Sequence, residues 1–210
     1  MISLAIRTGR PQLTLNTWGR LKCSNLALPK LFDTEGKVMK VSKDLDYFSL
    51  FGLERNFVLD TIELSYKYKH LQRQLHPDKF ARASHEDKEI SEEWSSLVNN
   101  GYKILQKPLS RALYLLELVG YPLTEESIDI DPEFLSEIME LNEEIVEAGS
   151  SELLVLTETV KGKIEEYVDI IDVLLANGEF EKAREQVAHM KYYSNVLDKI
   201  FEKEAEFGMY

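Results

Sequence analysis

Apolar residues recur at helical spacing through the middle of the chain, and no stretch alternates as a β-strand would. Between 57 and 75 they step alternately by four and three residues, which places them on one helix face. They are Phe57, Thr61, Leu64, Tyr68, Leu71 and Leu75. A second stripe consists of Ile90, Trp94, Leu97, Gly101 and Leu105. The pattern predicts a short helix over 46–53 and long helices over 57–75 and 87–106, ended by Pro77 and Pro108.

The second half of the chain predicts four further helices. Residues 109–120 are too apolar for a free linker and should form a helix that Gly120 ends. Asp131 and Pro132 are a typical helix start, and the next stops are Gly149 and Asn177–Gly178. The last helix carries the stripe Phe180, Ala183, Val187, Met190, Ser194, Leu197 and Phe201. Short loops between long amphipathic helices favour antiparallel neighbours, so 131–206 predicts a three-helix bundle in an all-α fold.

The N-terminal composition differs from that of the rest of the chain. Residues 1–32 hold five basic side chains and no acidic one, with hydroxyl-bearing residues between them. This composition is typical of a mitochondrial transit peptide, so residues 1–40 are set apart from the predicted fold. A disordered basic arm is the alternative interpretation.

Charge and cysteine content exclude several classes of function. Five of the 25 Lys and Arg lie within 1–32, so the remainder carries 20 against 37 Asp and Glu, a net charge of −17. Such a surface disfavours a nucleic-acid partner. No apolar run reaches the length of a membrane span, so no membrane partner is expected. The single cysteine, Cys23, excludes a multi-cysteine zinc site, and the four histidines are scattered, so we expect neither metal nor cofactor.

The strongest local signal is the tripeptide His76–Pro77–Asp78, followed by Lys79, between two predicted antiparallel helices. The helix before it turns basic at that end, with Lys67, Lys69 and Arg73. A charged loop beside a basic face suits docking onto an acidic partner. Two alternatives are a plain turn in which Asp78 caps the next segment, and a catalytic His–Asp pair, although no nucleophile or phosphate loop is recognisable nearby.

The second signal is an acidic segment, because residues 112–160 contain no Lys or Arg. Within it, the stripe Phe134, Ile138, Leu141 and Ile145 should face the bundle. Leu135 and Met139 lie on an adjacent stripe that continues to Glu143 and Glu147, with Ser136 and Glu140 beside it. An apolar pair ringed by carboxylates is typical of a binding surface for a basic partner. The alternative is a solvated acidic face with a wide core stripe.

These helices, with the tripeptide between the second and third, resemble a J-domain. The stretches LQRQLHPDKF and KPLSRALYLLELVG resemble the HscB type of J-protein in particular. The resemblance covers residues 46 to about 205 and implies an L-shaped molecule. Its parts would be a J-domain at 46–108, a connecting helix at 109–122 and a scaffold-binding three-helix bundle at 131–206.

The resemblance also implies a function, that of a co-chaperone and not of an enzyme. The protein would stimulate ATP hydrolysis by a mitochondrial DnaK-type heat-shock chaperone and deliver the iron–sulfur cluster scaffold to it, in the matrix with a cytosolic fraction left open. The implied chaperone contacts are His76, Pro77, Asp78, Lys79, Lys67, Lys69 and Arg73. The implied scaffold contacts are Leu135, Ser136, Met139, Glu140, Glu143, Glu147 and Tyr192.

Two departures from the family pattern stand out. Ser136 replaces the larger apolar residue that is common there, and the paired cysteines that animal members often carry before the J-domain are missing. Three other functions stay open: a J-protein with a different basic client, a hydrolase using His76 and Asp78, and a purely structural helical adaptor.

Overall fold

The computed structural model describes residues 29–34, 37–42, 44–124 and 130–208. In these ranges the regular secondary structure is helical apart from one isolated antiparallel bridge between Phe32 and Val38. The helices are α1 (Tyr47–Leu50), α2 (Thr61–Gln74), the 3₁₀ turn η1 (Pro77–Phe80), α3 (His85–Gln106), α4 (Pro108–Leu118), α5 (Pro132–Glu147), α6 (Ser150–Ala176) and α7 (Phe180–Glu206). The predicted all-α fold is confirmed.

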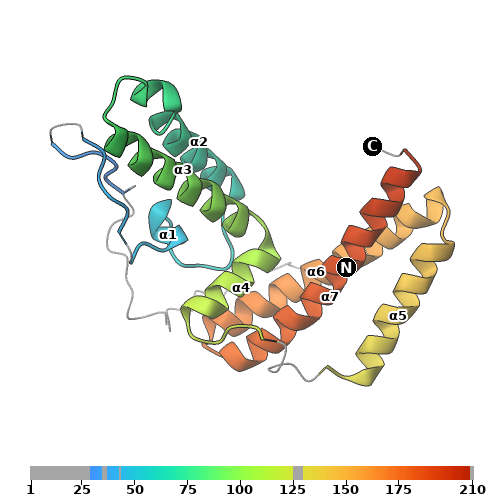
Figure 1. Ribbon diagram of the computed structural model, residues 1–210. Coiled ribbons are helices and arrows are strands. Elements are labelled where there is room, and N and C mark those ends of the chain that lie inside the picture. The colour runs from blue at the N-terminus through green and yellow to red at the C-terminus, as the bar shows by residue number, and fades with distance from the viewer. Residues whose placement is uncertain (1–28, 35–36, 43, 125–129, 209–210) are drawn as a thin grey trace, which may run out of the picture.

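Helices α2 and α3 form an antiparallel hairpin, and α1 packs across the base of α3 (Figure 1). The close approach depends on Gly101, where an added Cβ would lie 2.7 Å from Cδ1 of Tyr47. The predicted start of α2 was four residues early, because the side chain of Asp60 accepts hydrogen bonds from two backbone amides and caps the helix there. Phe57 is still buried, whereas Thr61 is exposed, contrary to the predicted stripe.

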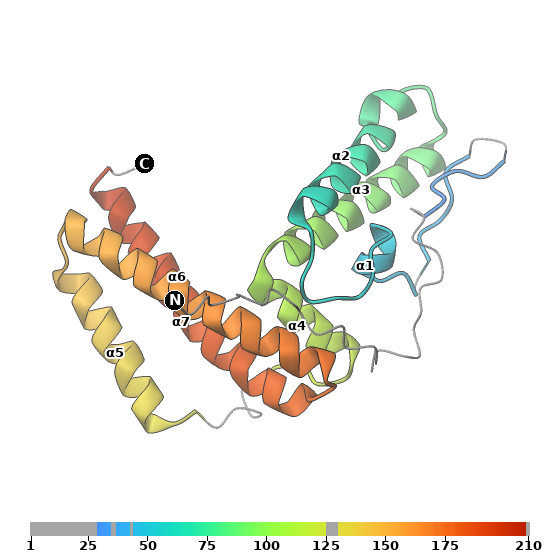
Figure 2. The same cartoon turned by 180° about the vertical axis from the view of Figure 1, so that it is seen from behind.

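Helix α4 joins the hairpin to the C-terminal bundle without a flexible joint. Its Ala112, Leu115 and Leu116 are completely buried, and they share one hydrophobic cluster with the hairpin and with one end of α6 and α7. Arg111 is buried as well and donates to the Leu105 carbonyl at 2.8 Å, near the C-terminal end of α3. Burial lowers the pKa of Arg111 to about 10. Figures 1 and 2 show the resulting L shape, with the hairpin and the bundle diverging from α4.

The bundle consists of α6 and α7 side by side, with α5 packed against α7 (Figure 2). The predicted core face of α5 is confirmed, since Ile138 and Ile145 are buried in a second cluster with Tyr193, Val196 and Ile200. The predicted stripe of α7 was correct only in its first half. Beyond Met190 the buried face shifts by one residue, from Ser194, Leu197 and Phe201 to Tyr193, Val196 and Ile200.

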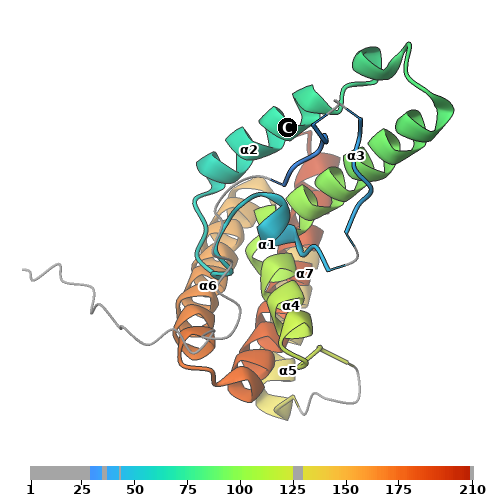
Figure 3. The same ribbon diagram turned by 90° about the vertical axis from the view of Figure 1, so that its left-hand side faces the viewer.

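Residues 29–34 and 37–42, the N-terminal ribbon, pack against the hairpin, although the sequence interpretation set residues 1–40 apart from the fold. Leu31 and Val38 are buried in the hairpin cluster, where their burial offsets the cost of ordering a short strand pair. In Figure 3 the ribbon, drawn in blue, lies over the space between α2 and α3. The predicted leader, as far as it falls on residues 1–28, lies outside the described residues.

Candidate interaction surfaces

The tripeptide forms an exposed corner at the tip of the hairpin. His76 is the N-cap of η1, and its Nδ1 accepts a hydrogen bond from the Asp78 backbone amide at 3.3 Å. The same nitrogen lies 3.4 Å from the Asp78 carboxylate. Pro77 sits at the first position of the turn, where its missing N–H is not needed. The Asp78 side chain is 91% exposed, so its carboxylate is free to meet a partner.

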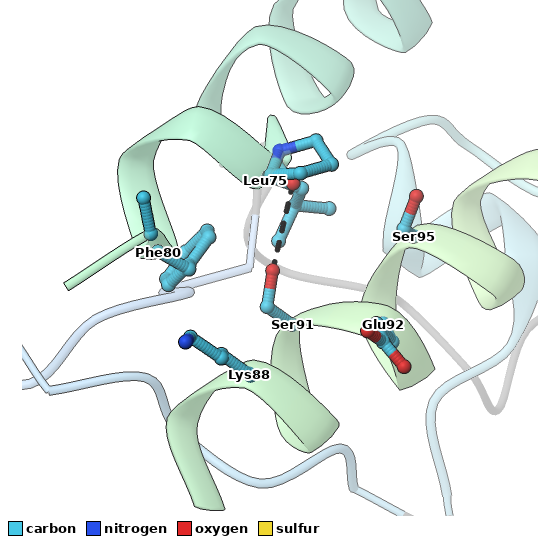
Figure 4. Close-up of a pocket in the computed structure, with 8 residues that line it drawn as sticks. Leu75, Phe80, Lys88, Ser91, Glu92 and Ser95 are labelled. Carbon is cyan, nitrogen blue, oxygen red and sulfur yellow. Dashed lines mark hydrogen bonds between the residues drawn. The ribbon is translucent and has the colours of Figure 1, made fainter. Parts of the chain in front are cut away.

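A hollow of about 250 Å³ lies behind this corner (Figure 4). Leu75, Pro77 and Phe80 supply apolar walls, and Lys88 and Glu92 lie on the α3 side. The remaining lining residues are Ala81, Ser91 and Ser95. Ser91 donates to the Leu75 carbonyl at 3.5 Å and so ties α3 to the last residue before the tripeptide.

The basic residues of α2 divide into two groups. Lys69 and Arg73 are exposed, and no hydrogen bond or ion pair to another described residue holds them. Lys67 differs, because its ammonium donates to the Gly52 carbonyl at 2.8 Å and pairs with Glu63, leaving its side chain only 17% exposed. Lys67 therefore joins α2 to the turn after α1 and exposes little of its side chain to a partner.

The sequence interpretation missed two apolar residues on the same face of α2. Ile62 is 81% exposed and Tyr66 is 70% exposed. At 100° per residue they fall within about 60° of Lys69 and Arg73 around the helix axis. The face therefore continues for about 16 Å along α2, from Arg73 to Ile62, with a basic half near the tripeptide and an apolar half beyond it.

The predicted scaffold contacts occupy one side of α5 and the adjoining edge of α7. Met139 is 64% exposed, and Ser136, Glu140, Glu143 and Glu147 are exposed as well. Leu135 and Tyr192 are half-buried. Tyr192 meets Phe134 edge-on, with ring centroids 5.7 Å apart, so the aromatic residue of α7 does lie beside the start of α5.

Val146 was missed by the sequence interpretation. It is 74% exposed and lies between Leu135 and Met139 in angle around the α5 axis, so it lengthens their apolar stripe. With Asn142, Glu143 and Glu147 it lines a hollow of about 320 Å³. A 3.6-residue period continued two turns beyond Met139 would have found it. On the α7 side, Lys199 donates to Asn142 Oδ1 at 2.6 Å.

A cluster of aromatic rings holds α5 against the bundle beneath this surface. Phe134 stacks on His189 at 4.2 Å between centroids, and Tyr193 donates to Glu137 at 2.6 Å. Burial raises the pKa of Tyr193, and the hydrogen bond to Glu137 adds to the shift. Burial lowers the pKa of His189, which favours its neutral imidazole. These ring contacts support the surface above them.

Two negative findings concern the described residues alone. No group of three or more His, Cys, Asp or Glu side chains within them could hold a metal ion. None of their helices combines the length and the hydropathy of a membrane-spanning segment.

Comparison with known proteins places this geometry in a family. Residues 130–200, which cover all of α5 and α6 and most of α7, match the model of the HSCB C-terminal oligomerisation domain. The human iron-sulfur cluster co-chaperone protein HscB is 43% identical over 157 residues, which are 74% of this chain and 67% of that protein. A co-chaperone HscB homolog of Azoarcus sp. is 34% identical over 168 residues, or 77% and 95% of the two chains.

The crystal structure of human co-chaperone protein HscB superposes with a TM-score of 0.79 at 38% identity, over 85% of this chain and 92% of that one. The helical fold and these relatives identify the class of protein as a co-chaperone. Within that class, the chain belongs to the HscB family.

Proposed function

We propose that this protein stimulates the ATPase of a mitochondrial DnaK-type heat-shock chaperone and delivers the iron–sulfur cluster scaffold to it, promoting cluster transfer. The observation that carries the proposal is one molecule with two exposed surfaces of opposite charge, joined by a shared hydrophobic cluster. A basic surface with the tripeptide lies on the hairpin, and an acidic surface with apolar residues lies on the bundle. The relatives' names, which include iron-sulfur cluster co-chaperone, support it.

The chaperone would bind the J-domain, residues 46–108. His76, Pro77, Asp78 and Lys79 would trigger hydrolysis, because they form its exposed corner. Lys69 and Arg73 would attract an acidic chaperone surface, and Ile62 and Tyr66 extend the same face of α2. Lys67 belongs to the family pattern, but its bonds to Gly52 and Glu63 argue for a structural role.

The scaffold would bind the bundle, residues 131–206. Leu135, Met139 and Tyr192 would enter its apolar surface, with Val146 at the far end. Glu140, Glu143 and Glu147 would surround them and select a basic partner. Ser136 is exposed beside them and offers only a small side chain. A J-protein with another basic client would use the same surface.

The activity would be to hold the chaperone and the scaffold together, and this chain would carry out no chemical step itself. Holding scaffold and chaperone on one body turns the second binding event into an intramolecular one and raises the local scaffold concentration. The buried connector α4 supports this, since a fixed geometry keeps that concentration high.

The test of the proposed function is single-turnover ATP hydrolysis by a mitochondrial DnaK-type chaperone, with and without the scaffold. The wild-type protein should accelerate hydrolysis, and His76→Gln should not. Equal acceleration by both proteins would contradict the role of the tripeptide.

The triple variant Leu135→Ala, Met139→Ala, Tyr192→Ala should keep chaperone stimulation but lose scaffold binding. Retained binding would point to another client.

The proposed location is the mitochondrial matrix. The proposal is based on the basic, acid-free composition of residues 1–32. Import of the full chain into isolated mitochondria, followed by N-terminal sequencing, tests it. Because the N-terminal ribbon is folded onto the hairpin, cleavage should fall before Leu31. A protease-sensitive, unprocessed chain outside the organelle would contradict a matrix location.

A further inference from the structure

We infer that the N-terminal ribbon positions the tripeptide of the hairpin, with Phe32 and Trp94 as the positioning residues. The inference rests on the proposed chaperone stimulation and adds to it a part of the chain that the sequence interpretation had set aside as leader. Ribbon and tripeptide are far apart in sequence but meet at the tip of the hairpin (Figure 3).

The tripeptide has little to hold it in place within the hairpin itself. Its side chains are exposed, and its hydrogen bonds stay within the turn. His76 bonds to Asp78, the His76 carbonyl accepts from the Lys79 amide at 2.9 Å, and the Asp78 carbonyl accepts from the Ala81 amide at 3.4 Å. The residue of η1 that reaches the core is Phe80, which is 7% exposed. The position of the Asp78 carboxylate therefore depends on where the Phe80 ring sits.

The ribbon covers that ring. Phe32 stacks on Phe80 with centroids 6.4 Å apart and planes only 10° from parallel. Phe80 also lines the hollow behind Pro77 (Figure 4). Without Phe32, the Phe80 ring would lose an apolar neighbour while still bordering that hollow. The loss would loosen its packing, because unfilled space forfeits van der Waals contacts.

The ribbon is in turn fixed to α3. The indole Nε1 of Trp94, a residue only 3% exposed, donates to the Met39 carbonyl at 2.6 Å. A buried donor without this acceptor would be costly, so the bond determines where the ribbon lies. The two halves of the ribbon are joined by the Met39 amide to the Leu31 carbonyl at 2.8 Å, one residue before Phe32. The contact path is α3, Met39, Leu31, Phe32 and Phe80.

Surface charges contribute less. Lys37 and Lys40 lie 3.7 and 3.5 Å from Glu86, near the start of α3, but all three side chains are more than half exposed. Exposed pairs of this kind stabilise weakly. The ring stack and the indole bond are therefore the contacts to test.

The experiment uses the full-length protein with Phe32→Ala, and Phe207→Ala as matched control, since Phe207 is half exposed at the far end of α7. Phe32→Ala should lower the maximal ATPase stimulation roughly three- to tenfold at saturating protein. The half-saturating concentration should hardly change, because the docking face of α2 is intact. Phe32→Leu should restore most of the stimulation, and Trp94→Phe, which removes the indole donor and leaves a smaller ring, should act like Phe32→Ala.

Hydrogen exchange gives a second readout that does not need the chaperone. The amides of Lys79, Ala81 and Ala83, which bond within the turn, should exchange faster in Phe32→Ala, while those of the bundle do not change. Unchanged exchange together with unchanged maximal stimulation would overturn the inference. Absent stimulation by the wild type would instead overturn the proposed function, and the exchange data would still decide whether the ribbon holds the turn.

Discussion

At the scale of single residues, neighbouring lysines of α2 have different surroundings that their sequence positions do not reveal. Lys67 and Lys69 both belong to the basic end of the helix, and charge patterning treats them alike. Only the fold brings the Gly52 carbonyl within 2.8 Å of the Lys67 ammonium. The sequence does not reveal that Ile62 and Tyr66 are exposed either. An apolar residue is expected to be buried unless its helix face is known to meet solvent.

Replacing Lys67 should affect stability, and replacing Lys69 with Arg73 should affect docking. Lys67→Ala leaves the Gly52 carbonyl without its charged donor and should lower the free energy of unfolding by about 1–3 kcal/mol. Urea denaturation measures this. Lys69→Ala with Arg73→Ala should leave unfolding unchanged but raise the half-saturating concentration for ATPase stimulation, most clearly at low salt. If folded Lys67→Ala protein stimulated the ATPase less than wild type, Lys67 would have to be counted among the docking residues.

Asp46 makes part of the stability depend on pH. Burial alone would raise its pKa, but hydrogen bonds from Arg55 and Ser49 outweigh burial, so the pKa of Asp46 lies below its ordinary value. A lowered pKa contributes stability above the unfolded-state value of about 3.9, and this is lost as pH falls through the folded-state value. Asp46→Asn should cost about 3 kcal/mol at pH 7. The difference from wild type should shrink below pH 4 in denaturation curves; a constant difference would contradict the ionic origin.

At the scale of elements, the ends of α5, α6 and α7 were predictable, because proline, glycine and asparagine interrupt the apolar pattern there. The bounds of α5, α6 and α7 lie within a residue of those predicted, because Asp131–Pro132, Gly149 and Asn177–Gly178 leave few alternatives. The start of α2 was wrong because periodicity ran through the Asp60 cap. The N-terminal ribbon was missed because one bridge gives no period and because its first residues, 29–32, belong to the basic, acid-free segment that predicted a leader.

The length of the apolar stripe on α5 leads to a prediction for scaffold binding. Val146 lies about 16 Å from Leu135 along the helix axis. A partner that lies along the whole stripe would therefore bury Val146 as well. Val146→Ser should weaken scaffold binding by roughly 1 kcal/mol, or about fivefold, in isothermal titration calorimetry. Val173→Ser is the matched control, because Val173 is 57% exposed on α6 and outside the proposed contact set. Equal affinities of the two variants would limit the surface to the first half of α5.

At the scale of the whole molecule, the sequence predicted an L shape from a resemblance, and the structure supplies its physical cause. The hydrophobic cluster of the hairpin continues through α4 into the ends of α6 and α7, so the two units share a core. Residue patterns show that α4 is apolar but not which elements cover it. The C-terminal end of α4 is also fixed, since Gly120 adopts a positive φ of 82° and Tyr121 contacts Phe180 with centroids 5.5 Å apart.

A looser connector should weaken delivery without weakening either binding step. In α4 Glu117 is exposed, so Glu117→Gly costs the helix about 1 kcal/mol without opening the core. Tyr121→Ala removes the contact to Phe180. The double variant should bind chaperone and scaffold with wild-type affinity, yet show less acceleration of ATP hydrolysis when both are present, because a wider range of angles dilutes the scaffold at the chaperone. Small-angle X-ray scattering should report a broader distribution of shapes.

Glu165→Gly, on an exposed site of α6 away from the connector, should match wild type in both measurements. Undiminished acceleration by a double variant whose scattering has broadened would show that tethering alone, and not the fixed angle, brings the scaffold to the chaperone.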